Sequence, residues 1–294
     1  MKVTSRQAAG RAAPEALPER EPEGGAPEAP RVAQRDVFEQ ARSFAEDATY
    51  NAEPRVAALQ VMGLAATSPE ERQTVFESAR AFTRSDLTAE RTVAALQVMG
   101  LSAATPDARK AVFEEARAFT DGSYTVRHTV AALQVMALTA ETAEVKQEVS
   151  AEASAFTGSG YTVASRVDAL QVLGLTADTA ARKQAVHDAA APFTDGAYSG
   201  AVTVAALQVM GVTADTPEER QAVHDAAGHF TRGYNAERTV AALQVMALTA
   251  DTAAEAQGVR AQVAPFTEGD FTAKRTVAAL QVMALAAPEN DPHS

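Results

Sequence analysis

One glutamine recurs in every copy of an apolar nonapeptide, and it is the most regular polar group in the chain. An amide donates and accepts hydrogen bonds, so a row of amides on one face can bind the backbone of an extended peptide. The same row can satisfy buried polar groups of neighbouring repeats, and we favour this structural interpretation. The seven glutamines are Gln60, Gln97, Gln134, Gln171, Gln208, Gln244 and Gln281.

A second series of positions varies where the rest of the repeat is strict. It follows an apolar valine in the first half of each copy, and it changes from apolar at the N-terminal end to polar at the C-terminal end. Such variation can carry binding specificity, although drift at a position that packing constrains weakly is the favoured alternative. We call these residues the variable stripe: Phe38, Phe76, Phe113, Ser150, His187, His224 and Arg260.

Metal and catalytic chemistry have weaker support. His187-Asp188 and His224-Asp225 are equivalent pairs in adjacent copies, and two imidazoles could share a metal ion, but this spacing matches no known metal motif. The chain has no cysteine and lacks the nucleophile, phosphate-binding and dinucleotide-binding motifs. We therefore expect no metal, no cofactor, no catalytic residue and no enzymatic activity.

Asp168 is the most unusual single residue of the repeat, because the other six copies have alanine at its position. A carboxylate in so apolar a stretch must be exposed or have a partner. Arg166 lies on another face of the same expected helix, so we look for the partner in a neighbouring repeat.

These residues belong to a repeat of 36 or 37 residues. The first half of each copy has apolar residues at i, i+4 and i+7, which predicts an amphipathic helix. The second half is apolar on nearly all sides, which predicts a helix covered by several neighbours. The second half contains the string Val-Ala-Ala-Leu-Gln-Val-Met-Gly-Leu or a close variant, which begins at Val56, Val93, Val130, Val167, Val204, Val240 and Val277.

Helix starts are marked in both halves of the copies. Ser, Thr or Asn precedes each expected helix, and the side-chain oxygens of these residues can accept an unpaired backbone N–H. The first helices are expected to begin after Ser68, Thr105, Thr142, Thr179, Thr216 and Thr252, and the second helices after Asn51, Thr88, Thr125, Thr162, Ser199, Asn235 and Thr272. A bulky residue precedes each cap of a second helix and is expected to hold the loop against the core: Tyr50, Leu87, Tyr124, Tyr161, Tyr198, Tyr234 or Phe271.

Helix pairs that cannot bury themselves alone, copied seven times, predict an all-α fold of the α-solenoid type. The second helix also resembles HEAT-type repeats in the pattern Arg91…Ala94-Ala95…Val98…Leu101, with the arginine repeated at Arg238 and Arg275. The aspartate that HEAT repeats carry before the second helix is missing, so the resemblance is to a HEAT- or armadillo-like repeat class. It implies a scaffold that presents a concave surface to a protein or peptide. An α/α toroid, a closed ring with a central pocket as in some glycosidases, is the alternative architecture.

The chain divides into three parts. Residues 1–33 are rich in Pro, Glu and Ala and are expected to form a disordered arm, residues 34–287 the seven-repeat solenoid, and residues 288–294 a flexible tail. Because the last copy keeps its apolar signature with no eighth copy to cover it, a homodimer through this repeat is also expected.

Charge and hydropathy limit the partners. The net charge of −12 argues against nucleic acid and favours a basic protein or peptide. No signal peptide and no stretch long and apolar enough to span a membrane are recognised, so a cytoplasmic protein without membrane contact is expected. The favoured function is a non-catalytic protein- or peptide-binding scaffold. The alternatives are an enzyme on a closed toroid with an acidic pocket and a translocated bacterial effector that binds host protein.

Overall fold

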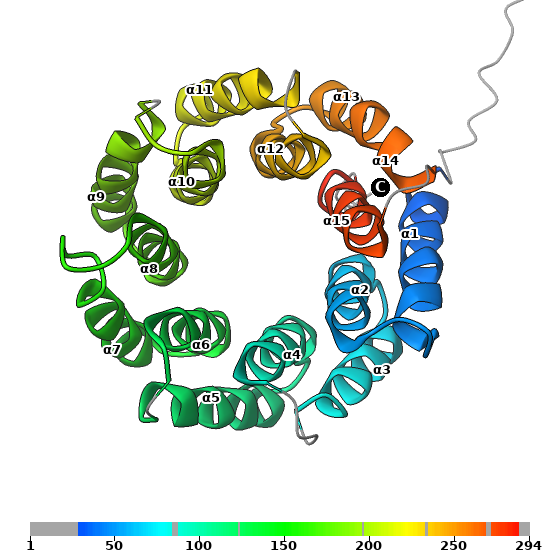
Figure 1. The fold of residues 1–294 in the computed structure, drawn as a ribbon, viewed down its shortest axis with the longest axis horizontal. Helices are drawn as coiled ribbons and strands as arrows, with labels where there is room; N and C mark the ends of the chain where they lie inside the picture. The colour runs from blue at the N-terminus through cyan, green and yellow to red at the C-terminus, as the bar shows by residue number, and fades with distance from the viewer. Residues whose placement is uncertain are drawn as a thin grey trace, which may run out of the picture.

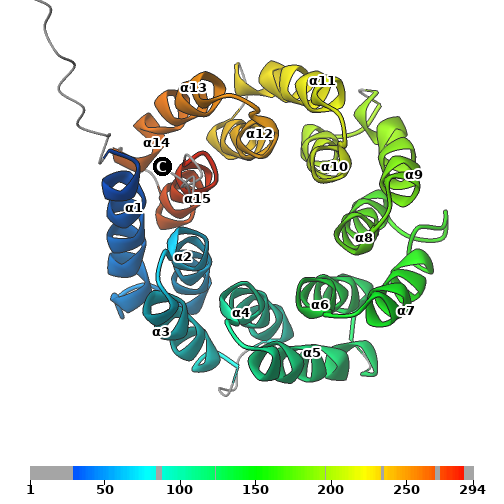
Figure 2. The same ribbon diagram turned by 180° about the vertical axis from the view of Figure 1, so that it is seen from behind.

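The computed structural model shows an all-α protein, with no strand among the residues that it describes. These residues are 29–83, 88–122, 124–195, 197–232, 235–268 and 272–287, with side chains described from residue 34 onward. Consecutive helices pack in pairs, and the pairs form two concentric rings (Figure 1 and Figure 2). The expected all-helical fold is thus confirmed.

The second helix of each pair stands in the inner ring, and the first helix stands outside it. The inner helices are α2 (Ala52–Ala65), α4 (Ala89–Ser102), α6 (Val126–Thr139), α8 (Val163–Thr176), α10 (Gly200–Thr213), α12 (Ala236–Thr249) and α15 (Ala273–Leu285). The outer helices are α1 (Ala29–Glu46), α3 (Pro69–Arg80), α5 (Pro106–Thr120), α7 (Ala143–Ser154), α9 (Ala180–Ala190), α11 (Pro217–Gly228) and α13 (Ala253–Val263). Short helical turns follow three outer helices: η1 (Ala191–Thr194), η2 (His229–Thr231) and α14 (Pro265–Glu268).

The ring is closed, which corrects the expectation of an open solenoid. The last inner helix, α15, packs against the first, α2, just as α2 packs against α4. Outer helix α1 also contacts α15, as α3 contacts α2. The small rotation from each copy to the next therefore accumulates to a full turn, and the first and last copies bury each other's apolar faces.

Closure also removes the reason for expecting a dimer through the last repeat. The apolar residues Val277, Leu280 and Val282 of α15 are 2%, 1% and 0% exposed within a single chain. Because α2 and α12 flank this helix, its buried side needs no second molecule.

Small side chains let the inner helices approach one another. A Cβ atom on Gly174 of α8 would lie 3.1 Å from the Thr213 methyl of α10, and one on Gly211 would lie 3.0 Å from the Thr249 methyl of α12. Both threonines are buried, and their hydroxyls donate to carbonyls four residues earlier in their own helices. These small residues let neighbouring inner helices pack directly against one another around the ring.

The helix caps agree with the sequence. All six outer-helix caps predicted above accept a hydrogen bond from the backbone three residues on, and Ser68, Thr216 and Thr252 form complete capping boxes. All seven inner-helix caps occupy the N-cap position, although Thr88, Thr125 and Thr272 make no side-chain capping bond.

The aromatic residues before the inner helices hold the loops as expected. Each described tyrosine of this set packs at a tilt against the phenylalanine near the C-terminal end of the preceding outer helix, with ring centroids 4.8–5.5 Å apart. The pairs are Phe44–Tyr50, Phe119–Tyr124, Phe156–Tyr161 and Phe193–Tyr198. Leu87, Tyr234 and Phe271 lie outside the described residues.

The N-terminal boundary differs from the expectation. Helix α1 begins at Ala29, within the segment predicted to be disordered, and Pro30 is in its first turn. Proline is tolerated there because the first N–H groups of a helix have no intrahelical partner. Residues 1–28 and 288–294 lie outside the described residues. Among the helices that the structure describes, none combines the length and the apolar character that a membrane crossing requires.

Candidate functional site

The variable stripe lies within the core of the ring or packs against it. Phe38 and His224 are 4% and 9% exposed, and Phe76 and Phe113 pack against the core while remaining partly exposed. The His224 ring lies 3.4 Å from the Thr249 hydroxyl of the next inner helix. Ser150, His187 and Arg260 are half-buried. Phe38 and His224 therefore belong to the packed interior, and the other positions of the stripe are only partly exposed.

The histidine pairs do not converge on a metal site. His187 is on α9 and His224 on α11, and the described residues contain no group of three or more potential metal ligands. The buried Nδ1 atom of His187 has no hydrogen-bond partner in the part of the chain that the structure describes.

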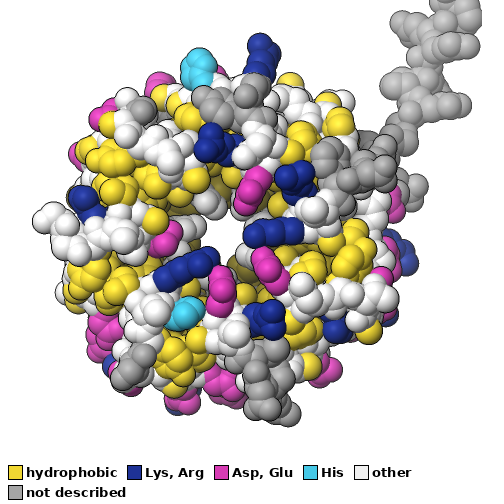
Figure 3. All heavy atoms as spheres, viewed as in Figure 1, with side chains coloured by type: hydrophobic (Ala, Val, Ile, Leu, Met, Phe, Trp, Pro, Cys, Tyr) yellow, Lys and Arg dark blue, Asp and Glu magenta, His cyan; other side chains and the backbone are white. Residues whose placement is uncertain are grey.

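The repeated glutamines lie on the side of the inner helices that faces the centre of the ring. Each is half-exposed on a helix whose flanking residues are buried. Figure 3 shows the molecule hollowed at this centre, and we call the enclosed space the lumen. Two further half-exposed or exposed positions on each inner helix share this face: the alanine or Asp168 three residues before the glutamine, and the leucine or valine four residues after it.

The glutamine amides bond to one another from copy to copy. Gln97 Nε2 donates to Gln134 Oε1 at 3.1 Å, and Gln134 Nε2 donates to Gln171 Oε1 at 3.0 Å. Among the described side chains these two bonds link three of the seven amides, so the row is a short ladder across α4, α6 and α8. These bonds join side chains of neighbouring repeats, which is the role that the structural interpretation assigns to the glutamines. Each amide can still form further hydrogen bonds as a donor and as an acceptor.

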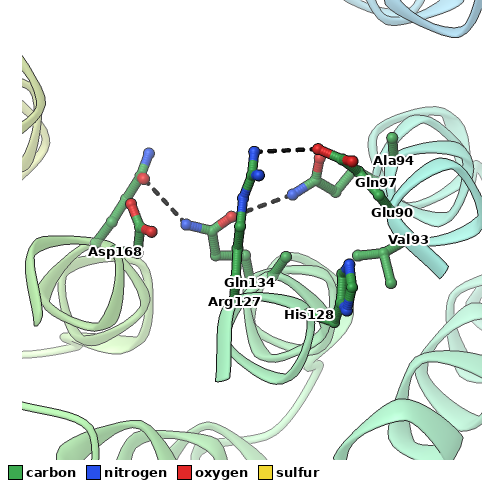
Figure 4. A pocket seen from close by; sticks show the side chains of 10 residues that line it. Glu90, Val93, Ala94, Gln97, Arg127, His128, Gln134 and Asp168 are labelled. Carbon is green, nitrogen blue, oxygen red and sulfur yellow. Dashed lines mark hydrogen bonds and ion pairs between the residues drawn. The ribbon is translucent and has the colours of Figure 1, made fainter. Parts of the chain in front are cut away.

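A pocket of about 310 Å³ opens along this ladder (Figure 4). Its wall combines the three amides with charged and small residues from the same three helices. The lining residues are Glu90, Val93, Ala94 and Gln97 of α4, Arg127, His128, Ala131 and Gln134 of α6, and Asp168 and Gln171 of α8.

Charged side chains surround the mouth of the lumen on the face seen in Figure 3. One position in the first turn of the inner helices is charged in five of the seven copies, and its residues are Glu53, Glu90, Arg127, Ala164, Ala201, Glu237 and Lys274. Two ion pairs join neighbouring helices there: Arg127–Glu90 at 3.1 Å, and Lys274–Glu53 at 3.2 Å across the closing joint. The mouth is uncharged at this position only over α8 and α10, where alanine replaces the charged residue.

Asp168 lies below this uncharged sector, on the lumen side of α8. Burial raises the pKa of its carboxyl group, and the nearby Arg127 guanidinium opposes that rise. Arg127 directs its guanidinium to Glu90, and in the described ranges the Asp168 carboxylate has no hydrogen bond and no ion pair (Figure 4). A partner for Asp168 was expected in a neighbouring repeat. Arg127 of α6 supplies a nearby positive charge, but it makes no direct contact with the Asp168 carboxylate.

Arg166 is not the partner of Asp168 either, as expected from its place on the helix. Its Nε donates to the Thr157 carbonyl at 3.0 Å, and its guanidinium lies over the Phe193 ring at 5.0 Å from the centroid. Arg55 repeats both contacts in the first copy, with the Ala45 carbonyl and the Phe82 ring. Each arginine therefore links its inner helix to the C-terminal ends of two outer helices or the residues that follow them.

Sequence reasoning missed Glu90, Arg127 and His128 as site residues. The sequence signal that could have revealed this site is a second variable position of the repeat, four residues before the lumen-facing alanine. The residue there is acidic, basic or uncharged, depending on the copy. It was overlooked because the lumen exists only once the ring closes.

Comparisons with known proteins do not place the chain in a family. No protein-family model matches it. A search of curated proteins likewise finds no match.

Proposed function

We propose that this chain is a non-catalytic binding module that takes up a segment of another polypeptide in the lumen of its ring. The observation that carries the proposal is the pocket across α4, α6 and α8, which combines a ladder of partly used amides with a carboxylate that has no ion pair among the described residues. A polypeptide backbone presents alternating N–H and C=O groups, and amide side chains can bond to both. In this proposal the HEAT-like repeat forms the wall of a channel.

The ladder leaves defined hydrogen-bonding groups for a ligand. Gln97 Oε1 accepts nothing from a described side chain, and Gln171 Nε2 donates to none. The Nε2 atoms of Gln97 and Gln134 each keep a second hydrogen, because the ladder uses only one. Above and below the ladder, alanine and leucine or valine positions give the lumen short apolar walls that suit side chains of moderate size.

A peptide-binding experiment tests the proposal. A library of random blocked hexapeptides is screened against the ring, and the affinity of selected peptides is measured by calorimetry for the wild type, Gln134→Leu and Gln208→Leu. Gln134→Leu removes the central amide of the ladder, and we expect about a tenfold or larger loss of affinity. Gln208→Leu is the matched control, because Gln208 has the same position on α10 but does not line the pocket.

The outcomes differ clearly. A loss with Gln134→Leu and none with Gln208→Leu supports binding in the lumen. Failure to select any peptide, or selection of peptides that bind both variants as tightly as the wild type, overturns the proposal.

A second candidate is an enzyme on a closed α/α toroid, which ring closure and the raised pKa of Asp168 favour. A carboxylic acid with a raised pKa can serve as a general acid, but glycoside hydrolysis needs a second, free carboxylate. Glu90 is the other carboxylate of this pocket, and it is paired with Arg127. Turnover of chromogenic glycosides that Asp168→Asn abolishes would favour this candidate over the binding module.

A further inference from the structure

We propose that the pocket across α4, α6 and α8 anchors a positively charged nitrogen group of a basic peptide, an ammonium or a guanidinium, on the carboxylate of Asp168. The inference rests on the proposed function, since it names the chemistry of the peptide that the lumen accepts.

The charges of the pocket are the first argument. Glu90 and Arg127 neutralise each other at 3.1 Å, and both are exposed at the mouth. Asp168 adds one negative charge deeper in the wall, with no ion-pair partner among the described residues. One positive charge on a ligand would therefore complete the pocket, whereas an anion would meet an unpaired carboxylate.

The surroundings of Asp168 are the second argument. Helix α8 packs against α6 and α10 in the inner ring and against α7 and α9 outside it. The charged or titratable groups that share the pocket with Asp168 are Arg127 and His128 of α6 and Glu90 of α4, and α10 contributes none. A partly buried carboxylate held this way costs stability, and a cationic partner that shares its site offsets that cost.

Access is the third argument. At the mouth position directly above Asp168, α8 carries Ala164 and α10 carries Ala201, both exposed, where five other inner helices carry charged side chains. A long basic side chain can thus enter over these alanines, and the Gln171 amide three residues after Asp168 lies on the same helix face to bond to the adjacent backbone. Figure 4 shows Asp168 and the Glu90–Arg127 pair on the same wall.

The test uses blocked peptides that differ in one group. The parent is a hexapeptide selected in the library screen. At the position whose side chain contributes most to its affinity, four versions carry lysine, arginine, acetyl-lysine or norleucine. A fifth version carries norleucine at that position and has a free N-terminal amine. Affinities are measured for the wild type, Asp168→Ala and Asp225→Ala. Asp168→Ala restores the residue of the other six copies, so the fold should persist, while Asp225→Ala removes an exposed carboxylate of outer helix α11.

We expect the lysine or arginine peptide to bind the wild type at least about tenfold more tightly than the neutral versions, and Asp168→Ala to abolish that difference. Asp225→Ala should leave it unchanged. If the peptide with the free N-terminal amine binds more tightly than the lysine and arginine peptides, the cation that binds Asp168 is the N-terminal ammonium group.

Two results overturn the inference, and they are distinguishable. Neutral and basic peptides that bind equally well, with Gln134→Leu still weakening both, contradict the cationic anchor but leave the peptide-binding function standing. Absence of any peptide binding in the lumen overturns the function and the anchor together.

Discussion

Asp168 lowers the stability of the folded ring at neutral pH, since burial raises the pKa of its carboxyl group. A raised pKa means that the folded state binds more protons than the unfolded state above the ordinary carboxyl pKa, so stability falls as the pH rises through that window. We therefore expect Asp168→Ala to increase the free energy of unfolding at about pH 7 by about 0.5 kcal/mol or more. The gain should shrink toward about pH 4, and only a pH-independent helix-propensity part should remain.

Urea unfolding of both proteins at the two pH values measures this difference. Asp225→Ala serves as the control, because Asp225 is exposed and bonded to Gln221 on the same helix. A gain from Asp168→Ala that is the same at both pH values would show that the carboxyl group titrates alike in the folded and unfolded states.

The residue that matters most was visible in the sequence, but its role was not. Comparison of the copies isolates Asp168 because six alanines stand at its position. The charges that lie near Asp168 depend on the rotation of α8 about its own axis relative to α6. A single sequence does not determine this rotation. The variable stripe shows a different limit of sequence reasoning, because variation from copy to copy does not reveal that Phe38 and His224 are buried.

At the scale of the helix, local rules were sufficient. Apolar spacing predicted both helices of each copy, and the cap residues predicted where they begin, because both signals depend on neighbours a few residues apart. The start of α1 was misplaced, since a proline-rich composition predicts disorder while proline in a first turn is compatible with a helix.

The caps can be compared directly. Thr216→Ala removes the hydroxyl that accepts from the Glu219 backbone at 3.2 Å and breaks a capping box in which Glu219 bonds back to the Thr216 N–H. We expect a loss of about 1 kcal/mol in the free energy of unfolding. Thr88→Ala changes the same residue type at the N-cap of α4, where no side-chain capping bond exists, so its effect should be clearly smaller. Equal losses in chemical denaturation would mean that the capping box contributes nothing.

At the scale of the whole molecule, closure is the property that sequence reasoning did not predict. An open superhelix and a ring differ by a small change in the rotation at each joint, repeated around the chain, and the same repeat pattern is compatible with both. The apolar signature of the last copy has a partner within the same chain, because α15 packs against α2. The Lys274–Glu53 pair belongs to the same closing joint, in a register equivalent to that of Arg127–Glu90.

Closure makes a prediction that separates a ring from a solenoid. In an open array, removal of a terminal copy leaves a shorter array of similar stability per repeat. In the ring, a chain that ends at Ala250 loses α13 and α15 and exposes the apolar faces of both α2 and α12, each of which packs against α15. We expect this truncated protein to self-associate and to lose its cooperative melting transition, as light scattering and thermal denaturation would show. A chain that ends at Ala287 keeps both joints and should remain monomeric with an unchanged melting temperature. A monomeric, cooperatively melting protein that ends at Ala250 would contradict the stabilising role of the joint between α15 and α2.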